Sequence, residues 1–308
     1  MADTIRHFRR VEDLDRDQLI AVLDHADGLK ADRAAGPRSD LVGRTVAMIF
    51  EKPSTRTRVS FQVAVSELGG SPLALSSAEL QLGRGETIAD TAAVLSRYVH
   101  GLVVRTFGQD RLDELAANAT IPVVNALTDE EHPCQALADL QTVREHLGGF
   151  AGRTLTYVGD GNNVAHSLLL AGAMVGLSVR VAHPEGYAPD SAVVARANEL
   201  ASGSGAEVVV TTDPVAGVSG ADAVYTDVWA SMGQEQEADA RLEVFAPFTV
   251  TPQLFGHAAD DAVFLHCLPA HRGEEVSPEV IDGPRSVVFD QAENRLHAQK
   301  ALLARLLA

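Results

Sequence analysis

Thr-Leu-Thr-Tyr-Val at 154–158, followed by Gly-Asp-Gly-Asn-Asn at 159–163 and an apolar stretch at 164–175, is the segment that decides the fold. The first part is typical of a buried strand, and the apolar stretch after the turn is typical of a helix. A strand, a tight turn and a helix in this order form part of a βαβ unit. We therefore predict a parallel sheet flanked by helices in this part of the chain.

The same alternation extends in both directions from this segment. Further strands are predicted at 44–50, 101–106, 121–125, 178–182, 207–210, 223–226 and 262–266, and helices after Ser54, at 110–118 and at 294–308. The pair Gly148-Gly149 ends a helix just before the pattern restarts, and it marks a domain boundary. We predict an α/β protein with two domains, each a parallel sheet flanked by helices.

Composition limits the classes of partner. The chain of 308 residues is 46% hydrophobic and 22% charged, and its formal charge is −17. That charge argues against a nucleic-acid partner and against adsorption to an anionic membrane. No apolar run reaches about 18 residues, so no transmembrane helix is predicted. The two cysteines, Cys134 and Cys267, fall inside candidate motifs, which favours a cytoplasmic protein with free thiols.

Most of the unusual polar residues follow predicted strands. In open parallel sheets, ligands bind at the loops beyond the carboxyl ends of the strands. Ser54, Arg105, Asp160, Asp227 and Cys267 all end or follow a predicted strand. These loops are therefore the predicted functional site.

The turn at 54–57, Ser-Thr-Arg-Thr, begins a helix. Free backbone N–H groups and hydroxyls at such a turn suit an anion, and Arg56 adds a guanidinium that binds phosphate in bidentate fashion. Arg105 ends an apolar strand, where it suits an anion, a carbonyl oxygen or a structural carboxylate. His132 can donate to a developing oxyanion, and Gln135 can bind an amide NH2. For an isolated motif, a simple helix cap with a solvated arginine remains open.

The second half of the chain carries groups suited to an amine. The turn at 159–163 lacks the third glycine of a dinucleotide loop, so Asn162 and Asn163 are assigned to a small polar substrate instead. Asp227 suits an ammonium group, and Cys267 is expected to point into the cleft. The histidines and cysteines lack the close spacing of a zinc site, so no metal is predicted. A serine hydrolase is disfavoured because no Gly-x-Ser-x-Gly elbow is present.

These motifs together resemble the aspartate/ornithine carbamoyltransferase family over nearly the whole chain. The resemblance rests on the segments at 50–58, 83–87, 132–135, 227–233 and 266–269. The Ser-Met-Gly loop at 231–233 and the His-Cys-Leu-Pro segment at 266–269 are typical of the ornithine branch. The resemblance implies transfer of a carbamoyl group from carbamoyl phosphate to the δ-amine of L-ornithine, giving L-citrulline and phosphate, without a cofactor.

The resemblance also implies the domains and the site residues. It implies a carbamoyl phosphate-binding domain at 1–147, to which a C-terminal helix at about 291–308 returns, and an ornithine-binding domain at 148–290. The expected carbamoyl phosphate contacts are Ser54, Thr55, Arg56, Thr57, Gln81, Arg105, His132, Gln135, Cys267, Leu268 and Arg295. The expected ornithine contacts are Asn163, Asp227, Ser231 and Met232. Cys267, Asp227, Arg105 and His132 are the expected catalytic residues.

Gln81 resembles a residue that the family supplies from a neighbouring subunit, which implies a homotrimer or a multiple of trimers. The implied role is arginine biosynthesis, although the direction of the reaction stays open. Carbamoyl transfer to putrescine or acetylornithine is an alternative within the family. A non-catalytic amino-acid-binding protein is an alternative from another class, disfavoured because a binder needs no oxyanion donors.

Overall fold

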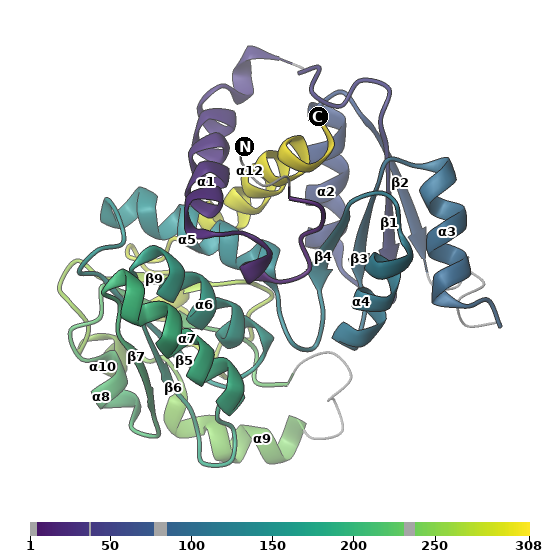
Figure 1. Ribbon diagram of the computed structural model, residues 1–308. Coiled ribbons are helices and arrows are strands. Elements are labelled where there is room, and N and C mark those ends of the chain that lie inside the picture. The colour runs from purple at the N-terminus through teal and green to yellow at the C-terminus, as the bar shows by residue number, and fades with distance from the viewer. Residues whose placement is uncertain (1–4, 37, 77–84, 231–237) are drawn as a thin grey trace. The chain divides into compact units, whose positions relative to one another are not determined.

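The structure of the protein is a computed structural model that describes residues 5–36, 38–76, 85–230 and 238–308. The chain divides into two compact units, which we call unit 1 (Met1–Ala138 with Asn294–Ala308) and unit 2 (Asp139–Glu293). Within the described residues, each unit contains a parallel sheet with helices beside it, as Figure 1 shows. The predicted fold class is therefore confirmed.

The sheet of unit 1 has the strand order β2-β1-β3-β4, and all its strands are parallel. Its strands are β1 (Thr45–Phe50), β2 (Ser71–Ser76), β3 (Gly101–Arg105) and β4 (Val123–Leu127). Every residue of β3 is buried, as expected for a parallel strand covered on both faces. The helical segments are η1 (Val11–Asp13), α1 (Arg16–Ala31), η2 (Arg33–Ala35), α2 (Thr55–Glu67), α3 (Ile88–Tyr98) and α4 (Gln109–Asn118).

Unit 2 has the strand order β7-β6-β5-β8-β9, again parallel throughout. Its strands are β5 (Thr154–Val158), β6 (Ser178–Ala182), β7 (Val208–Thr211), β8 (Ala223–Thr226) and β9 (Val263–His266). The helical segments are α6 (Asn163–Val175), α7 (Ser191–Ser204), α8 (Pro214–Val218), α9 (Ala238–Phe245), η5 (Ala246–Phe248), α10 (Pro252–Phe255) and α11 (Pro278–Ile281). The remaining helices, α5 (Pro133–Leu147) and α12 (Val288–Leu307), each contain a point of division between the units.

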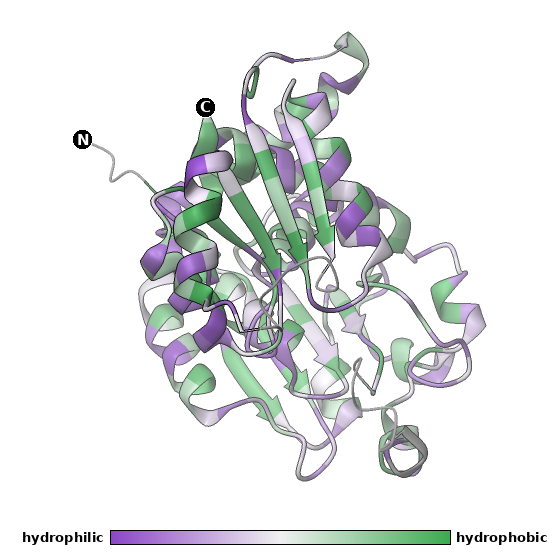
Figure 2. Ribbon diagram, turned by 90° about the vertical axis from the view of Figure 1, so that its right-hand side faces the viewer, coloured by the Kyte–Doolittle hydropathy of each residue, from purple (hydrophilic) through white to green (hydrophobic). Residues whose placement is uncertain are grey.

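Each sheet buries its apolar side chains against its own helices. Ile49, Leu102 and Leu112 belong to the core cluster of unit 1, and Val158 and Phe264 to a core cluster of unit 2. Burying one such side chain contributes about 1.5–3 kcal/mol. Figure 2 shows the same pattern, since the strands are largely green and the helices carry most of the purple residues.

Most element boundaries differ from the sequence prediction by one or two residues, and three differences have a local cause or are larger. The strand expected at 121–125 begins at Val123, after Pro122, whose nitrogen has no N–H for the ladder. The edge strand β2 was not expected, because its residues are only partly buried and it contains Pro72. The final helix begins at Val288 rather than at Asn294.

The end of α12 lies among the helices of unit 1, as expected. Lys300 on α12 donates to the Glu67 carboxylate at the end of α2, across 2.7 Å. Lys30 on α1 donates to Asn294 Oδ1, across 2.8 Å. Figure 1 shows the yellow C-terminal helix beside α1 and α2. Side-chain bonds from two helices therefore hold this terminal segment in unit 1.

In both sheets the strand order reverses at an inner strand, so that successive connections lead to opposite sides of it. In unit 1, β1 has β2 on one side and β3 on the other; in unit 2, β5 has β6 and β8 on its two sides. Ligands in open parallel sheets bind outside the carboxyl ends of the strands at such a switch point. The loops after β1, β3, β5 and β8 are therefore the places to look for a site. No helix of the described residues is long and apolar enough to cross a membrane.

Candidate active site

The turn after β1 is built around the cap of α2. Ser54 is the N-cap residue, and its hydroxyl accepts a hydrogen bond from the Thr57 backbone N–H across 3.3 Å. Thr55 and Arg56 are exposed on the first turn of the helix, whereas Thr57 is fully buried. Helix N-termini with exposed N–H groups and a nearby guanidinium favour anions. Ser54 thus serves as a helix cap, and the same turn has the chemistry expected for a phosphate site.

Arg295 joins this turn from the far end of the chain. It lies on α12, is 4% exposed, and donates to the Thr57 hydroxyl across 2.7 Å. A buried guanidinium needs hydrogen-bond acceptors around it, and the Thr57 hydroxyl is one of them. The Thr57–Arg295 contact therefore brings a cation to the N-terminal end of α2.

Arg105 and His132 complete the polar group in unit 1. Arg105 is the last residue of β3 and is 7% exposed, and His132 directly precedes α5 and is 5% exposed. Burial, and then the positive charges of Arg295 and Arg105, hold the pKa of His132 well below its usual value. The imidazole is therefore neutral near pH 7 and can donate one hydrogen bond while carrying no charge.

The first turn of α5 places two more residues of the His-Pro-Cys-Gln segment. Gln135 is buried, and its backbone N–H bonds to the His132 carbonyl across 3.0 Å. The Cys134 thiol donates to the Asn125 carbonyl, and burial raises its pKa to about 12. Cys134 is therefore a protonated packing residue, and Gln135 is the polar side chain that this turn contributes to the group.

Two charged residues before the Ser54 turn have structural partners. Lys52 pairs with Asp129 and lies 4.4 Å from the centre of the Phe107 ring. Glu51 accepts a hydrogen bond from Arg111 across 2.7 Å. Both residues stabilise the loop after β1 and leave Arg56 as the exposed cation of the turn.

In unit 2, the turn after β5 is shaped by close packing. An added Cβ at Gly161 would lie 2.1 Å from the backbone nitrogen of Pro189, so any larger residue must displace the chain there. The Asn162 side-chain oxygen caps α6 by accepting from the N–H groups of Val164 and Ala165. The glycine therefore allows this close packing, and Asn162, a predicted substrate contact, is the helix cap. Asn163 is the first residue of α6 and is partly buried.

Asp227 follows β8 and is 7% exposed. Its Oδ1 accepts from the Val228 N–H across 2.8 Å and from the Cys267 thiol across 3.0 Å. The Asn162 side-chain amide donates to Oδ2 across 3.4 Å. No ion pair joins Asp227 to a lysine or arginine of the described residues, so this carboxylate is available to pair with an ammonium group.

Cys267 follows β9 and carries the thiol nearest to Asp227. Burial, and then the Asp227 carboxylate, raise its pKa well above the usual value. The thiol is therefore protonated near pH 7 and acts as a hydrogen-bond donor. Leu268, the next residue, has a positive φ of 58°, a conformation that is uncommon for a non-glycine residue and costs conformational energy.

A second carboxylate lies near Asp227 but is neutralised. Asp160 forms an ion pair of 2.6 Å with Arg241, a residue of α9 that is 7% exposed. Burial raises the pKa of Asp160, and the Arg241 hydrogen bond opposes that shift. Arg241 also stacks over the Tyr187 ring, 5.0 Å from its centre. The sequence interpretation did not identify this arginine, because nothing in the spacing of 160 and 241 links them.

Three predicted site residues lie outside the described residues: Gln81, Ser231 and Met232. The structure brings together Ser54, Thr57, Arg105, His132, Gln135 and Arg295 in unit 1, and Asp227 and Cys267 in unit 2. Each group is consistent with the predicted chemistry: an anion and oxyanion group in unit 1, and an ammonium group in unit 2.

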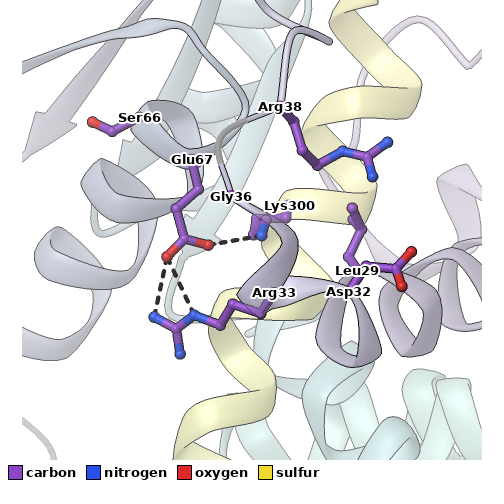
Figure 3. A pocket seen from close by; sticks show the side chains of 8 residues that line it. All are labelled: Leu29, Asp32, Arg33, Gly36, Arg38, Ser66, Glu67 and Lys300. Atoms are coloured by element: carbon purple, nitrogen blue, oxygen red, sulfur yellow. Dashed lines mark hydrogen bonds and ion pairs between the residues drawn. The ribbon is translucent and has the colours of Figure 1, made fainter.

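A cavity of about 370 Å³ in unit 1 contains none of the predicted site residues (Figure 3). Its side chains come from α1, η2, α2 and α12 and from the loops beside η2, and Glu67 receives hydrogen bonds from both Lys300 and Arg33. Arg38 pairs with Asp40. The cations around this cavity already have carboxylate partners, so it lacks the uncancelled positive charge of a phosphate site.

Two family models match the chain. The carbamoyl-P binding domain of aspartate/ornithine carbamoyltransferase matches residues 6–145, and the Asp/Orn binding domain of the same family matches residues 151–306. Together they cover nearly the whole chain.

Individual relatives agree with these models. An ornithine carbamoyltransferase of Parafrankia sp. is 61% identical, covering 99% of this chain and 96% of that protein. An ornithine carbamoyltransferase of Acidothermus cellulolyticus is 60% identical, covering 98% of this chain and 97% of that protein. The solved structure of the Pyrococcus furiosus ornithine carbamoyltransferase matches with a TM-score of 0.96 at 52% identity, covering 99% of this chain and 97% of that one. The chain therefore belongs to the aspartate/ornithine carbamoyltransferase family.

Proposed function

We propose that this chain transfers the carbamoyl group of carbamoyl phosphate to the δ-amine of L-ornithine, giving L-citrulline and phosphate. Membership of the family supports a carbamoyl transfer, and the names of its relatives support ornithine as the acceptor. The observation that best supports ornithine is the environment of Asp227. Its carboxylate is buried, has no lysine or arginine partner among the described residues, and accepts a hydrogen bond from the Cys267 thiol.

Carbamoyl phosphate binds to the domain formed by residues 1–147 and the helix at about 291–308. In this proposal Ser54, Thr55, Arg56 and Thr57 hold the phosphate through backbone N–H groups, hydroxyls and the Arg56 guanidinium. Arg105, His132, Gln135 and Arg295 hold the carbamoyl group and the bridging oxygen. Cys267 and Leu268 contribute further contacts, and Gln81 comes from a neighbouring subunit. The neutral His132 supports this assignment, since it can donate to an oxygen without adding another positive charge beside Arg105 and Arg295.

L-Ornithine binds to the domain at 148–290. Asp227 binds its α-ammonium, and Asn163, Ser231 and Met232 hold the rest of the amino acid. The Asn162 amide and the Cys267 thiol fix the orientation of the Asp227 carboxylate by donating to its two oxygens. Because Asp160 is already paired with Arg241, Asp227 is the carboxylate left to meet the ammonium.

The reaction is an acyl transfer without a covalent enzyme intermediate. The lone pair of the δ-nitrogen attacks the carbamoyl carbon, and the carbonyl π electrons move to the oxygen. Arg105, His132 and Thr57 stabilise that oxyanion. The electrons then return, the bond from carbon to the phosphate oxygen breaks, and phosphate leaves with the added negative charge. Catalysis in this scheme comes from orientation and preorganised electrostatics.

The proton of the δ-nitrogen leaves with the phosphate in this proposal. A thiol whose pKa is raised well above its usual value is a poor proton acceptor, so Cys267 serves as a donor that positions Asp227 and the amine. A phosphate oxygen is the remaining base at the reacting atoms.

A direct assay tests the acceptor. Formation of the carbamoylated product is measured with ornithine, putrescine and acetylornithine at equal concentration, each with carbamoyl phosphate; the products are citrulline, carbamoylputrescine and acetylcitrulline. Ornithine is expected to be preferred, because acetylornithine has no α-ammonium for Asp227 and putrescine has no α-carboxylate. Preference for either alternative acceptor contradicts the proposal, and carbamoyl transfer to none of the three makes the chain a non-catalytic binder.

We further propose a homotrimer or a multiple of trimers. Large apolar side chains are exposed on unit 1, including Val59 on α2, Val94 and Tyr98 on α3, and Phe107 after β3. Exposed apolar surface of this kind suits a contact with another copy of the chain. Light scattering at assay concentration is expected to give about three chain masses or a multiple; an active single chain contradicts it.

The proposed setting is arginine biosynthesis in the cytoplasm. Arginine biosynthesis is supported by membership of the family. The cytoplasm is supported by the free state of both cysteines, Cys134 and Cys267, which fits a reducing compartment.

A further inference from the structure

We infer that the turn after β9 binds one divalent first-row transition-metal ion through His271, Glu274 and Glu275. The Nδ1 atom of His271 lies 3.5 Å from a Glu274 carboxylate oxygen and 3.9 Å from Glu275 Oε2. One donor atom from each of the three side chains lies within 4.8 Å of the others. An ion with bonds of about 2.0–2.2 Å needs donors about 3–4 Å apart, so small side-chain rotations suffice.

Glu275 provides the observation that points to a cation. The residue is fully buried, and its Oε1 accepts from the His271 backbone N–H across 2.6 Å and lies 3.1 Å from His266 Nε2. Its other oxygen, Oε2, is buried with no hydrogen-bond partner among the described residues. A buried carboxylate oxygen without a donor is costly, and a metal ion at this position satisfies it.

The backbone of the turn holds the three side chains in place. The Glu274 N–H bonds to the His271 carbonyl across 3.0 Å, and the Gly273 N–H bonds to the Val276 carbonyl across 2.8 Å. Gly273 has a φ of 93°, which a residue with a side chain rarely adopts. The donors are therefore set on a closed turn before any ion arrives, which lowers the entropic cost of binding.

Charge at the turn also favours a cation. Arg272, the cation inside the turn, makes two hydrogen bonds to Asp282, of 2.8 and 2.6 Å, and is thus committed elsewhere. Among the residues that the structure describes, the carboxylates of Glu274 and Glu275 form ion-pair contacts with the His271 imidazole. One imidazole and two carboxylates suit Zn²⁺, Co²⁺ or Mn²⁺, with water in the remaining positions.

A neighbouring cluster, formed by Asp227, His266 and Cys267, is less suited to a metal ion. Its donor atoms also lie within 4.8 Å of one another. However, His266 Nδ1 accepts from the Leu268 N–H across 2.9 Å, and Nε2 faces Glu275. Both ring nitrogens are therefore occupied, and the cluster is part of the candidate active site already described.

The same bonds connect the inferred site to the Cys267 segment. An ion on Glu275 Oε2 restrains the carboxylate whose other oxygen holds His266, and His266 in turn holds the Leu268 backbone. Since an ion that binds only the folded chain stabilises it, the ion is expected to raise the melting temperature.

Co²⁺ titration of the full-length chain tests the inference, with visible absorption and calorimetry as readouts. One Co²⁺ per chain is expected at this turn, with d–d bands of nitrogen and oxygen ligands and no thiolate-to-cobalt charge-transfer band. His271→Ala and Glu274→Gln are each expected to weaken binding about tenfold or more. His257→Ala, which removes an exposed histidine elsewhere in unit 2, is the matched control and keeps the wild-type affinity.

Cys267→Ser separates the two clusters. Binding that persists in Cys267→Ser and is lost in Glu274→Gln supports the inferred site, whatever the outcome of the citrulline assay. The inference is overturned by absence of binding at millimolar Co²⁺, by unchanged affinity in both turn variants, or by a thiolate band that disappears in Cys267→Ser. Melting temperatures without metal verify that each variant is folded.

Discussion

The thiol of Cys267 donates a hydrogen bond to Oδ1 of Asp227 across 3.0 Å, and the same carboxylate accepts from the Asn162 amide through Oδ2. Burial, and then the Asp227 carboxylate, raise the pKa of the thiol, so Cys267 is the protonated donor of the pair. This hydrogen bond gives Cys267 a role in positioning the Asp227 carboxylate, which is distinct from a role in proton transfer.

Cys267→Ser is expected to lower kcat while leaving the shape of the pH profile unchanged. Serine keeps a hydroxyl donor to Asp227, although its shorter bond to carbon moves the donor. The activity at subsaturating ornithine rises toward alkaline pH in both enzymes, because an amine with a pKa of about 10.4 must lose its proton to attack. A pH profile of kcat/KM for ornithine measures this. A profile that loses an ionisation in the variant assigns the proton to Cys267.

Asp227→Asn is expected to raise the KM for ornithine by about 10- to 100-fold, since a charge-assisted hydrogen bond to an ammonium is worth about 1.5–3 kcal/mol. Asparagine has nearly the same shape and keeps an oxygen acceptor. The dissociation constant of carbamoyl phosphate, measured by calorimetry, is expected to stay near that of the unmodified chain. An unchanged KM for ornithine removes Asp227 from the amine site.

Arg56→Gln is expected to lower kcat/KM for carbamoyl phosphate by about 10- to 100-fold without changing the melting temperature. The side chain is exposed on the first turn of α2, so its removal leaves the core intact. Arg58→Gln is the matched control, because Arg58 is also exposed on α2 and lies farther from its N-terminus. Equal losses in the two variants point to a general effect of charge rather than to a phosphate contact.

Thr57→Val is expected to destabilise the fold by about 1–3 kcal/mol and to weaken carbamoyl phosphate binding. Valine has the size of threonine but removes the hydroxyl that accepts from Arg295 across 2.7 Å. Thr57→Ser restores the hydroxyl and is expected to recover most of the lost affinity. Denaturant unfolding gives the free energy, and calorimetry gives the affinity. Failure of serine to recover affinity assigns the loss to packing.

Glu131 predicts a dependence of stability on pH. Its carboxylate accepts from the Val11 N–H, and burial raises its pKa from 4.5 to about 7. Between these values the folded state holds a proton that the unfolded chain has lost. The contribution to stability is therefore complete below about pH 4.5 and is lost as the pH rises through about 7, by at most about 3 kcal/mol.

Glu131→Gln is expected to flatten this decline in the free energy of unfolding between pH 5 and pH 8. Glutamine retains an oxygen for the Val11 N–H but cannot ionise. Glu130→Gln, which changes the exposed neighbour, is the control and keeps the decline. Equal slopes in Glu131→Gln and in the unmodified chain remove Glu131 as their source.

Local sequence patterns were sufficient to predict most of the strands and the positions of the loops that follow them. Asp227 and Cys267 were both expected at strand ends, and parallel pairing of β8 with β9 brings such ends together. The amphipathic edge strand β2 was missed, because partial exposure and Pro72 weaken its apolar signal.

Local patterns could not predict side-chain contacts between residues that are far apart in the sequence. Arg295 entered the prediction only through the resemblance, since no spacing links it to Thr57. Arg241 was missed altogether, because its ion pair with Asp160 depends on the tertiary fold of unit 2. Asn162 illustrates a different difficulty, because a polar residue in a glycine-containing turn suits a ligand and a helix cap equally. Only the structure shows that its side-chain oxygen caps α6.

The return of α12 to unit 1 determines when the contacts of unit 1 can be completed during translation. Residues 5–138 leave the ribosome before residues 294–308, yet Arg295, which bonds to Thr57, lies 238 residues after it, and Lys300, which bonds to Glu67, lies 233 residues after it. Unit 2, by contrast, is a continuous stretch of the chain. The hydrogen bonds that Thr57 and Glu67 accept from α12 can therefore form only after residues 294–308 have been translated, and by then every residue of unit 2 has already been made.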